Sequence, residues 1–222
     1  MTRTVPRRVE ILSVARRQIA ERGYTETSVR DIAEAVGLLA GSLYSHFRSK
    51  AEMVHEIVRG FYDELLPAQR EVLERDATGA ERYRDMIAVV FDICAAHREE
   101  LTILHYDWAT LSTLDELTDV KDQSLETLDL WLEVLGAGVA DGSVVASIDP
   151  EVMVRVTTSS IHALLDTVRY SDRPLPPVDL SQQRTALQHA LLGGVAADRA
   201  LAGAPQRARR RTKAAPTDGA TS

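Results

Sequence analysis

Apolar residues recur at intervals of three and four residues along nearly the whole chain, and this spacing limits the possible folds more than any other feature. In the first segment, Val9, Leu12, Ala15 and Ile19 fall on one face of a helix. The chain has no convincing run of alternating apolar and polar residues, which a half-buried strand would need, and no internal repeat. We therefore expect an all-α protein of about nine helices.

The first fifty residues divide into three helical segments separated by short breaks. Gly23 is a typical helix end, and the next helix is expected to begin at Ser28, with Asp31 three residues later, and to stop at Gly37. A third segment spans residues 40–46. Two short helices joined by a tight turn with glycine are typical of a helix-turn-helix, whose second helix enters the major groove of DNA.

The residues of the third segment suit that task. Leu38, Leu43 and Phe47 can face inward and anchor the helix. Four small residues leave the opposite face open for close approach to base edges: Ala40, Gly41, Ser42 and Ser45. The segment therefore predicts a DNA-reading helix.

Later start and stop signals predict a long helical body. Residues 49–52 (Ser-Lys-Ala-Glu) form a capping box that begins a long helix, which Pro67 is expected to end or kink. The Asp-Pro pair at 149–150 marks another start, and the prolines within 174–177 mark a break before a last helix that Asp179 caps. The further helices are expected at about residues 79–97, 99–113, 115–140, 150–171 and 180–203.

The net charge of −7 conceals two basic ends. The formal charge is +4 over residues 1–50 and +4 over residues 204–222, so residues 51–203 carry −15. A basic end can bind phosphates while an acidic body repels DNA and limits which face docks. We expect a helix-turn-helix DNA-binding domain at 1–50, an effector-binding and dimerisation domain at 51–203, and a disordered basic tail at 204–222.

Two basic clusters can each be interpreted in two ways. Arg3, Arg7 and Arg8 form either an arm on the phosphates or a solvated terminus. The cluster Arg207–Lys213 is either a solubilising tail or a second DNA contact.

Other features of the sequence argue for a cytoplasmic protein without a membrane partner. No stretch approaches the roughly 18 apolar residues that a membrane-spanning helix needs. The basic N-terminus lacks the apolar region and cleavage site of a signal peptide. The single cysteine, Cys94, cannot form an internal disulfide, which agrees with a reducing compartment.

Residues 9–58 resemble the DNA-binding domain of TetR-family repressors. That family's pattern is a helix ending in glycine, then Thr-Val-Arg-Asp-Ile-Ala, a glycine, and Gly-Ser/Thr-Leu-Tyr-x-His-Phe-x-x-Lys. This chain carries the matching residues at the same spacing: 21–24 (Glu-Arg-Gly-Tyr), 28–33 (Ser-Val-Arg-Asp-Ile-Ala), Gly37, 41–47 (Gly-Ser-Leu-Tyr-Ser-His-Phe) and 49–50 (Ser-Lys). The resemblance implies a three-helix DNA reader followed by a helical regulatory domain.

The resemblance also implies DNA-contacting roles for single residues. Tyr44, His46 and Lys50 are expected to contact the DNA backbone, and Thr27 or Ser28 to cap the second helix near a phosphate. The small residues of the third segment would lie nearest the bases. The whole expected set is Thr27, Ser28, Leu39, Ala40, Gly41, Ser42, Tyr44, Ser45, His46 and Lys50.

Three of these residues keep an alternative. Leu39 stands where the family often has a serine or threonine cap, so it puts the base preference in doubt and could contact a thymine methyl instead. His46 either touches a phosphate or packs inward. Lys50 is either a DNA contact or a helix-start residue, although at a helix start its charge opposes the dipole.

The resemblance implies a homodimer built from the last two helices, so that two reading helices about 34–36 Å apart bind a palindromic operator in double-stranded DNA. The apolar residues that could form this interface, or ordinary intrachain core, are Val152, Val156, Ile161, Leu164, Leu165, Val168, Leu187, Leu191, Leu192 and Val195. The pair Gly193–Gly194 would allow close helix approach.

The resemblance further implies an effector pocket among the helices between residues 80 and 171. Large or polar residues that interrupt the apolar stripes are the candidates, although each can instead be core. His162 is the preferred candidate, because its helix is otherwise apolar or small. The candidates are Tyr83, Phe91, Cys94, His105, Tyr106, Trp108, Trp131 and His162.

Residues 37–54 and 131–135 resemble a branch of the family that senses acyl-CoA thioesters of lipid or sterol catabolism. The helix expected at about 150–170 offers Arg155 and Arg169 but no obvious cluster for coenzyme A phosphates. The implied mechanism is a population shift, in which the effector alters the two readers through the long helix from Lys50. An activator, or a regulator without an effector, is the alternative.

An enzyme is not expected. The glycines 136, 138 and 142 follow no strand and have the wrong spacing for a dinucleotide fingerprint. The six histidines lack metal-ligand spacing, so neither a metal nor another cofactor is expected.

Overall fold

A computed structural model describes residues 6–165 and 179–195, and within them the protein is all-α, as expected. The described part contains nine α-helices, one short 3₁₀ turn and no strand. In chain order the elements are α1 (Arg7–Arg22), α2 (Val29–Ala35), α3 (Ala40–Leu43), α4 (Lys50–Leu73), α5 (Gly79–Ala96), α6 (Arg98–Leu111), η1 (Asp115–Leu117), α7 (Thr118–Asp141), α8 (Pro150–Leu165) and α9 (Leu180–Val195).

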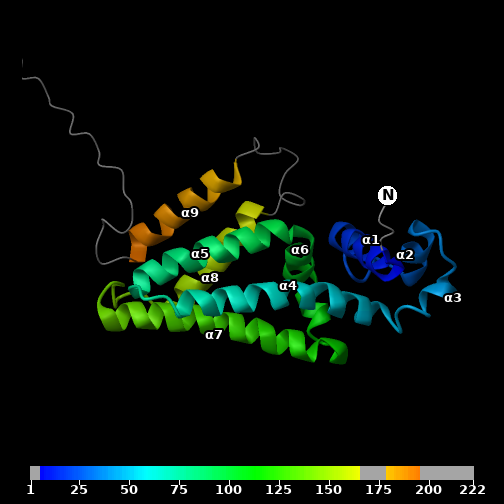
Figure 1. Cartoon of the computed structure of the whole chain (residues 1–222), viewed down its shortest axis with the longest axis horizontal. Coiled ribbons are helices and arrows are strands. Elements are labelled where there is room, and N and C mark those ends of the chain that lie inside the picture. The colour runs from blue at the N-terminus through cyan, green and yellow to red at the C-terminus, as the bar shows by residue number, and fades with distance from the viewer. Residues whose placement is uncertain (1–5, 166–178, 196–222) are drawn as a thin grey trace, which may run out of the picture.

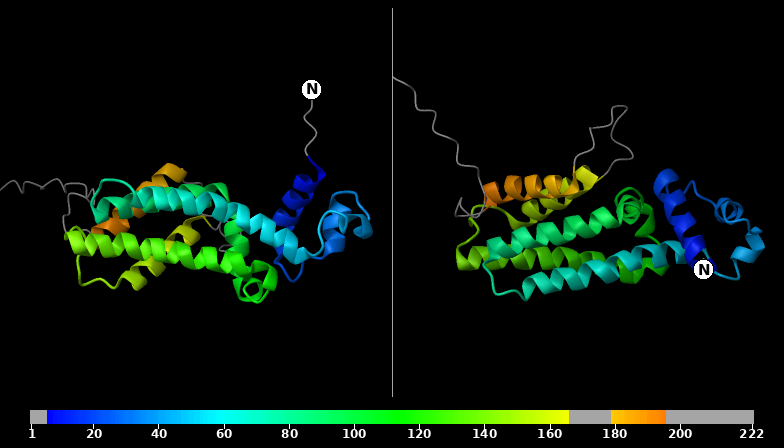
Figure 2. Two further views of the ribbon diagram at one scale, coloured as in Figure 1. Left: turned by 60° about the horizontal axis from the view of Figure 1, so that its bottom comes forward. Right: turned by 45° about the horizontal axis from the view of Figure 1, so that its top comes forward.

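The helices form a small lobe and a longer body (Figure 1). The lobe holds α1, α2 and α3, and α4 runs from it along the body beside α5 and α7. Helix α6 stands where the body meets the lobe and packs on α1, while α9 lies along α5 (Figure 2). The buried apolar side chains of the described residues form one continuous core through both parts.

Side-chain caps fix several helix starts. Ser28 and Asp31 form the expected capping box at α2, since each side chain accepts from the other's backbone N–H, at 3.1 and 2.9 Å. At α4, Ser49 accepts from the Glu52 N–H at 2.9 Å, but the Glu52 carboxylate accepts from Arg48 rather than from Ser49. At α4, therefore, only one of the two hydrogen bonds of the expected capping box is present.

Asp149 and Asp179 begin the last two helices. The Asp149 carboxylate accepts from two backbone N–H groups of α8, and that of Asp179 from two N–H groups at the start of α9. Both agree with the start signals in the sequence.

Pro67 does not end α4, which continues to Leu73. Proline removes the N–H that would bind the carbonyl four residues earlier, here that of Asp63. Both Pro67 and Asp63 are exposed, so water can reach that carbonyl, while Leu66 and Val72 remain buried on the other face. Burial of this face outweighs the local proline penalty.

Helices α5 and α7 meet backbone to backbone at the far end of the body. A Cβ added to Gly79 would lie 2.1 Å from the Cα of Gly138. The Gly79 N–H donates to the Asp141 carboxylate at 2.7 Å, and the next N–H donates to the Ser143 hydroxyl at 3.0 Å. Only glycine permits two backbones to come this close. The residues around Gly79 and Gly138 in the sequence do not predict the contact.

Several sequence-based expectations lie outside the described residues. They concern Arg3, the prolines within 174–177, the continuation of the last two helices to 171 and 203, and the basic tail at 204–222 with its Arg207–Lys213 cluster. Across 6–165 and 179–195, none of the helices has both the length and the apolar character required to cross a membrane.

Candidate DNA-binding surface and effector cavity

The turn between α2 and α3 presents α3 at the tip of the lobe. Gly37 adopts a positive φ of 69°, a conformation that glycine adopts without the steric penalty of a side chain. The next residue, Leu38, donates its N–H to the Ala33 carbonyl at 2.8 Å and closes α2. Leu43 and Phe47 are almost fully buried and anchor α3 from below, as the sequence predicts.

The opposite face of α3 is open. Leu39 is 80% exposed and Tyr44 is 55% exposed, the two most prominent apolar side chains of the lobe. Leu39 occupies the N-cap position without any side-chain cap, which agrees with the departure seen in the sequence. The smaller expected DNA contacts also lie here: Gly41, Ser42 and Ser45 are exposed, and Ala40 and His46 are half-buried.

Thr27 differs from the expected phosphate-side role. Its side chain is fully buried, and its hydroxyl donates to the Gly23 carbonyl at 2.9 Å. Ser28 is the exposed residue of the pair and supplies the cap of α2. Ser28, rather than Thr27, is therefore the residue that caps α2, because the Thr27 side chain is not accessible at the surface.

Lys50 also differs from expectation, because its ammonium group turns inward. It donates to the carbonyls of Tyr24 and, at 2.7 Å, of Thr27, and it lies 4.1 Å from the centre of the Tyr24 ring. Burial lowers the pKa of Lys50, and the negative charges of Asp107 and Glu26 oppose that shift. Lys50 thus ties the start of α4 to the loop before α2.

Arg8, one of the two described arginines of the expected basic arm, braces the lobe. Its guanidinium lies 4.0 Å from the centre of the Phe47 ring, donates to the Glu56 carboxylate at 2.6 Å and binds the His46 carbonyl. Arg7 likewise binds Glu10. Neither is a free arm, and the sequence carried no local sign of these long-range partners.

A cavity of about 320 Å³ lies among α4, α5, α6, α7 and α8. This volume is at the lower end of the range for small-molecule sites. Five of the expected candidates line it, namely Cys94, His105, Trp108, Trp131 and His162. The remaining lining residues are Phe61, Tyr62, Leu65, Val90, Leu101, Leu104, Ser124, Thr127, Thr158 and Ile161.

Tyr83 and Phe91 do not line this cavity, although both were candidates. Both side chains are fully buried, and the Tyr83 hydroxyl lies 2.5 Å from that of Thr157 in the core between α5 and α8. Burial raises the pKa of Tyr83 to about 12. Tyr106 lies beside a separate small recess instead. Large size and an interrupted apolar stripe did not distinguish wall residues from core residues.

The sequence-based candidates missed the contributions of α4 and the polar residues of α7. Ser124 and Thr127 precede Trp131 by seven and four residues, so all three lie on one face of α7. That spacing was the available signal. The Thr127 and Thr158 hydroxyls donate to carbonyls of their own helices, at 3.1 and 2.9 Å.

His105 of α6 and His162 of α8 meet at this cavity. Their Nδ1 atoms lie 2.8 Å apart and their ring centres 4.7 Å apart. Burial raises the pKa of the nearby Cys94 thiol to about 12, so this cysteine is not a reactive nucleophile.

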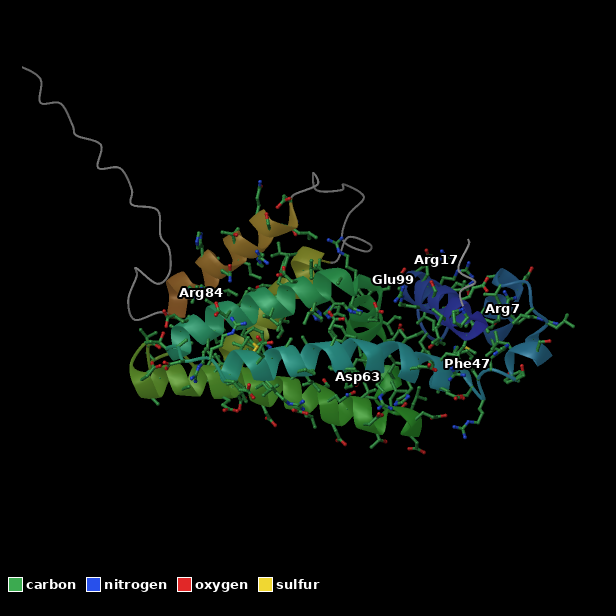
Figure 3. The ribbon with its side chains drawn as sticks, viewed as in Figure 1. Arg7, Arg17, Phe47, Asp63, Arg84 and Glu99 are labelled. Carbon is green, nitrogen blue, oxygen red and sulfur yellow. The ribbon has the colours of Figure 1, made fainter. Side chains whose placement is uncertain are left out.

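Helix α6 also holds the lobe. Arg16 of α1 donates to the Glu99 and Glu100 carboxylates at 2.6 and 2.9 Å, and Figure 3 shows Glu99 on the side of α6 that faces α1. Farther along α6, Asp107 accepts from the Tyr24 N–H at 3.1 Å. The helix that lines the cavity is thus joined to the lobe at two points.

An exposed helix-turn-helix attached to a helical body with a cavity among its helices defines a class: the DNA-binding transcriptional regulator with a ligand-binding domain. The comparisons with known proteins name the family. The pattern described as "Bacterial regulatory proteins, tetR family" matches residues 11–57, and that of "Tetracyclin repressor-like, C-terminal domain" matches residues 76–165. The chain belongs to the tetR family.

Relatives agree along most of the chain. The HTH-type transcriptional repressor KstR2 of Mycobacterium tuberculosis H37Rv is 31% identical over 189 residues, which cover 85% of this chain and 92% of that protein. The solved structure of the ketosteroid regulator KstR2 of M. tuberculosis has a TM-score of 0.77 at 30% identity, covering 88% and 98% of the two chains. AibR, solved with isovaleryl coenzyme A and operator DNA, has a TM-score of 0.69 at 22% identity, covering 85% and 97%, and shares the fold.

Proposed function

We propose that this protein is a repressor that binds a palindromic operator as a homodimer and leaves it when a small-molecule effector fills the cavity. In this proposal residues 1–50 bind DNA, residues 51–203 bind the effector and the second copy, and residues 204–222 form a basic tail. Regulators of the tetR family bind operator DNA as dimers and respond to small molecules.

The observation that carries the proposal is the double role of α6. Four cavity residues lie on this helix: Leu101, Leu104, His105 and Trp108. The same helix binds the lobe through Glu99 and Glu100 at its start and through Asp107. A ligand that displaces α6 must therefore also move the lobe or break these contacts.

Helix α4 supplies a second connection. It begins at the lobe, where Lys50 binds the loop before α2, and it lines the cavity at Phe61, Tyr62 and Leu65. An effector that binds one arrangement of α4 and α6 better than another shifts the population of lobe positions. A coupling of about 1–3 kcal/mol, or roughly 5–150-fold in operator affinity, suffices for regulation.

The proposed DNA contacts follow from exposure. Tyr44 and the small residues Gly41, Ser42 and Ser45 face solvent on α3 and just after it, and Leu39 projects beside them. A phenol can donate to a phosphate, and a leucine can contact a thymine methyl. Lys50 and Thr27 act through the position of the lobe rather than by touching DNA.

The proposed dimer interface is the outward face of α8 and α9. Val152, Val156 and Leu164 are exposed on α8, at 55%, 45% and 37%. On α9 the exposed residues near its end include the small Ala186, Ala190, Gly193 and Gly194 beside His189, and a Cβ added to either glycine would meet nothing within 4 Å. Some other expected interface residues are intrachain core instead, because α9 buries them against α5 and α8: Leu187, Leu191, Leu192 and Val195.

The proposed effector is an acyl-CoA thioester. The cavity's apolar walls suit an acyl group, but its volume of about 320 Å³ is too small to enclose coenzyme A as well. The relative KstR2 is described as a ketosteroid regulator, and AibR was solved with isovaleryl coenzyme A. The acyl group would then occupy the cavity while the nucleotide end projects from it.

Fluorescence anisotropy on labelled fragments of the upstream DNA, over a salt series, tests the proposal. Tight binding at physiological salt that Tyr44→Ala weakens, and that acyl-CoAs reverse, is the expected result. Leu125→Ala, which truncates a 60% exposed side chain on α7 outside the lobe, is the matched control and should bind DNA normally. Equal binding to random fragments would contradict the operator-binding proposal.

A further inference from the structure

The segment from Gly37 to Lys50, which holds the DNA-reading helix, has a simple charge pattern. It contains two fixed cations, Arg48 and Lys50, and no aspartate or glutamate. The nearest acidic residues on either side are Glu34 and Glu52. Any fixed positive charge that this segment presents to DNA must therefore come from Arg48 or Lys50.

Lys50 does not present its charge outward. Its ammonium group donates to the carbonyls of Tyr24 and Thr27 and lies over the Tyr24 ring. To reach a phosphate, the ammonium group would have to give up both of these hydrogen bonds. Arg48 is thus the remaining fixed cation of residues 37–50 that can face DNA.

The Arg48 side chain is held much less tightly. It is 93% exposed, and its Nε atom lies 3.5 Å from the Glu52 carboxylate, which is longer than a good charged hydrogen bond. An ion pair this exposed restrains the guanidinium only weakly. By contrast, three arginines of α1 that form ion pairs are only 37–41% exposed: Arg7, Arg8 and Arg16.

The backbone at Arg48, in contrast to its side chain, is fixed. Its N–H donates to the Glu52 carboxylate at 2.6 Å. Phe47 before it is buried under the Arg8 guanidinium, and Ser49 after it caps α4. Figure 3 labels Phe47 where the chain passes from α3 to α4. A long cation on a fixed backbone can reach a phosphate without the cost of ordering a loop.

Glu52 does not depend on the Arg48 guanidinium. The hydrogen bond from the Arg48 N–H is the main cause that lowers the pKa of Glu52, against an opposing effect of burial. The Arg8 guanidinium also lies 3.8 Å from the Glu52 carboxylate. A phosphate can therefore bind the Arg48 guanidinium while Glu52 keeps the Arg48 N–H and Arg8, and neither charge loses its last partner.

We propose that Arg48 contacts a phosphate of the operator, in the role that the family resemblance gives to Lys50. The inference rests on the proposed function, since it concerns the same DNA-binding surface. Arg48 lies three residues after the exposed Ser45 and outside α3, so it flanks the helix that reads the bases. The contact contributes affinity and salt dependence, while the base preference comes from α3.

Fluorescence anisotropy of Arg48→Gln over a salt series tests the contact. The probes are a labelled fragment of the upstream DNA and a labelled duplex of random sequence. We expect log K to fall less steeply with log salt, with a slope lower by about 0.9 for each protomer bound. At about 0.15 M salt this corresponds to an affinity about fivefold weaker per protomer. Because every duplex carries phosphates, the loss should be similar on both probes.

Three further variants locate the effect. Arg48→Lys keeps the charge and should keep the slope. Arg59→Gln removes the same charge from the surface of α4, where Arg59 pairs with Asp63 at 3.7 Å, and should change neither slope nor affinity. Lys50→Met should weaken binding without a change in slope. Thermal melting followed by circular dichroism should give Arg48→Gln the melting temperature of the wild type, because the side chain is almost wholly exposed.

Two outcomes would overturn the inference. One is an unchanged salt slope in Arg48→Gln. The other is a loss of affinity on the upstream fragment alone, which is the behaviour of a base contact. The wild type keeps the two proposals apart, since its equal binding to both probes would reject the operator-binding proposal. Specific binding by the wild type with an unchanged slope in Arg48→Gln would reject the Arg48 contact alone.

Discussion

Arg16 of α1 and Glu100 of α6 form an ion pair that joins the DNA-binding lobe to the effector domain, with an N–O distance of 2.9 Å. The Glu100 side chain is only 6% exposed, and the His97 Nδ1 atom lies 3.4 Å from the same carboxylate oxygen that Arg16 binds. A carboxylate so far from water depends on its partners. We therefore expect this pair to transmit a movement of α6 to the lobe.

Replacing Arg16 with methionine should loosen that connection. We expect a loss of about 1–3 kcal/mol in the free energy of unfolding, between the values for exposed and buried pairs, since Arg16 is 37% exposed. We also expect the effector to reduce operator affinity at least fivefold less than in the wild type. Urea unfolding and anisotropy with and without effector measure the two quantities.

The matched control for Arg16 is Arg59→Met. Arg59 pairs with Asp63 at 3.7 Å within α4, and both side chains are more than half exposed. This variant should change stability by less than about 1 kcal/mol and leave effector response intact. Equal responses in the two variants would show that the Arg16 pair does not couple the domains.

Lys50→Met distinguishes a positioning role from a phosphate contact. The ammonium group binds the Tyr24 and Thr27 carbonyls, so its loss should weaken operator binding by moving the lobe. The slope of log K against log salt should stay unchanged. A phosphate contact would instead lower that slope by about one. Tyr44→Phe serves as the comparison, since it removes a hydroxyl but no charge.

Local signals predicted much of the fold, because caps and helical periodicity act within a few residues. Ser28, Gly37 and Asp149 were read correctly for this reason. Pro67 was misread, because the burial of neighbouring α4 residues is a tertiary effect. Contacts between distant segments, such as Arg8 with Glu56, have no periodic signature in one sequence.

The site was predictable to a similar extent. The small residues beside the buried anchors Leu43 and Phe47 predict an open face on α3, and in the structure that face is exposed to solvent. The inward turn of Lys50 depends on carbonyls more than twenty residues away, so no local pattern reports it. For the cavity, aromatic side chains such as Tyr83 and Trp131 look alike in sequence, although the first lies in the core and the second lines the wall.

Tyr83→Phe tests the assignment of Tyr83 to the core. The variant removes a buried hydroxyl but leaves Thr157 bonded to the Met153 carbonyl at 2.8 Å. We expect a loss of about 1 kcal/mol in the free energy of unfolding and an unchanged Kd for decanoate and decanoyl-CoA. A marked change in these Kd values with unchanged stability would return Tyr83 to the effector site.

Gly79→Ala should be among the most destabilising single-methyl changes in the protein. The added Cβ would lie 2.1 Å from both the Cα and the N of Gly138, and backbone atoms cannot move aside as a flexible side chain can. Helices α5 and α7 would have to separate, which would also strain the bonds from Gly79 and Ala80 to Asp141 and Ser143. We expect a loss of more than about 3 kcal/mol.

Gly136→Ala adds the same methyl group to α7, about half a helical turn before Gly138. Gly136 is exposed, and its added Cβ would touch nothing within 4 Å. Since alanine favours a helix interior over glycine, this variant should gain about 0.5–1 kcal/mol. Urea unfolding of both proteins gives the comparison. Similar stabilities of the two variants would mean that α5 and α7 are not in backbone contact. The positions of these two helices, which both line the cavity, would then be wrong.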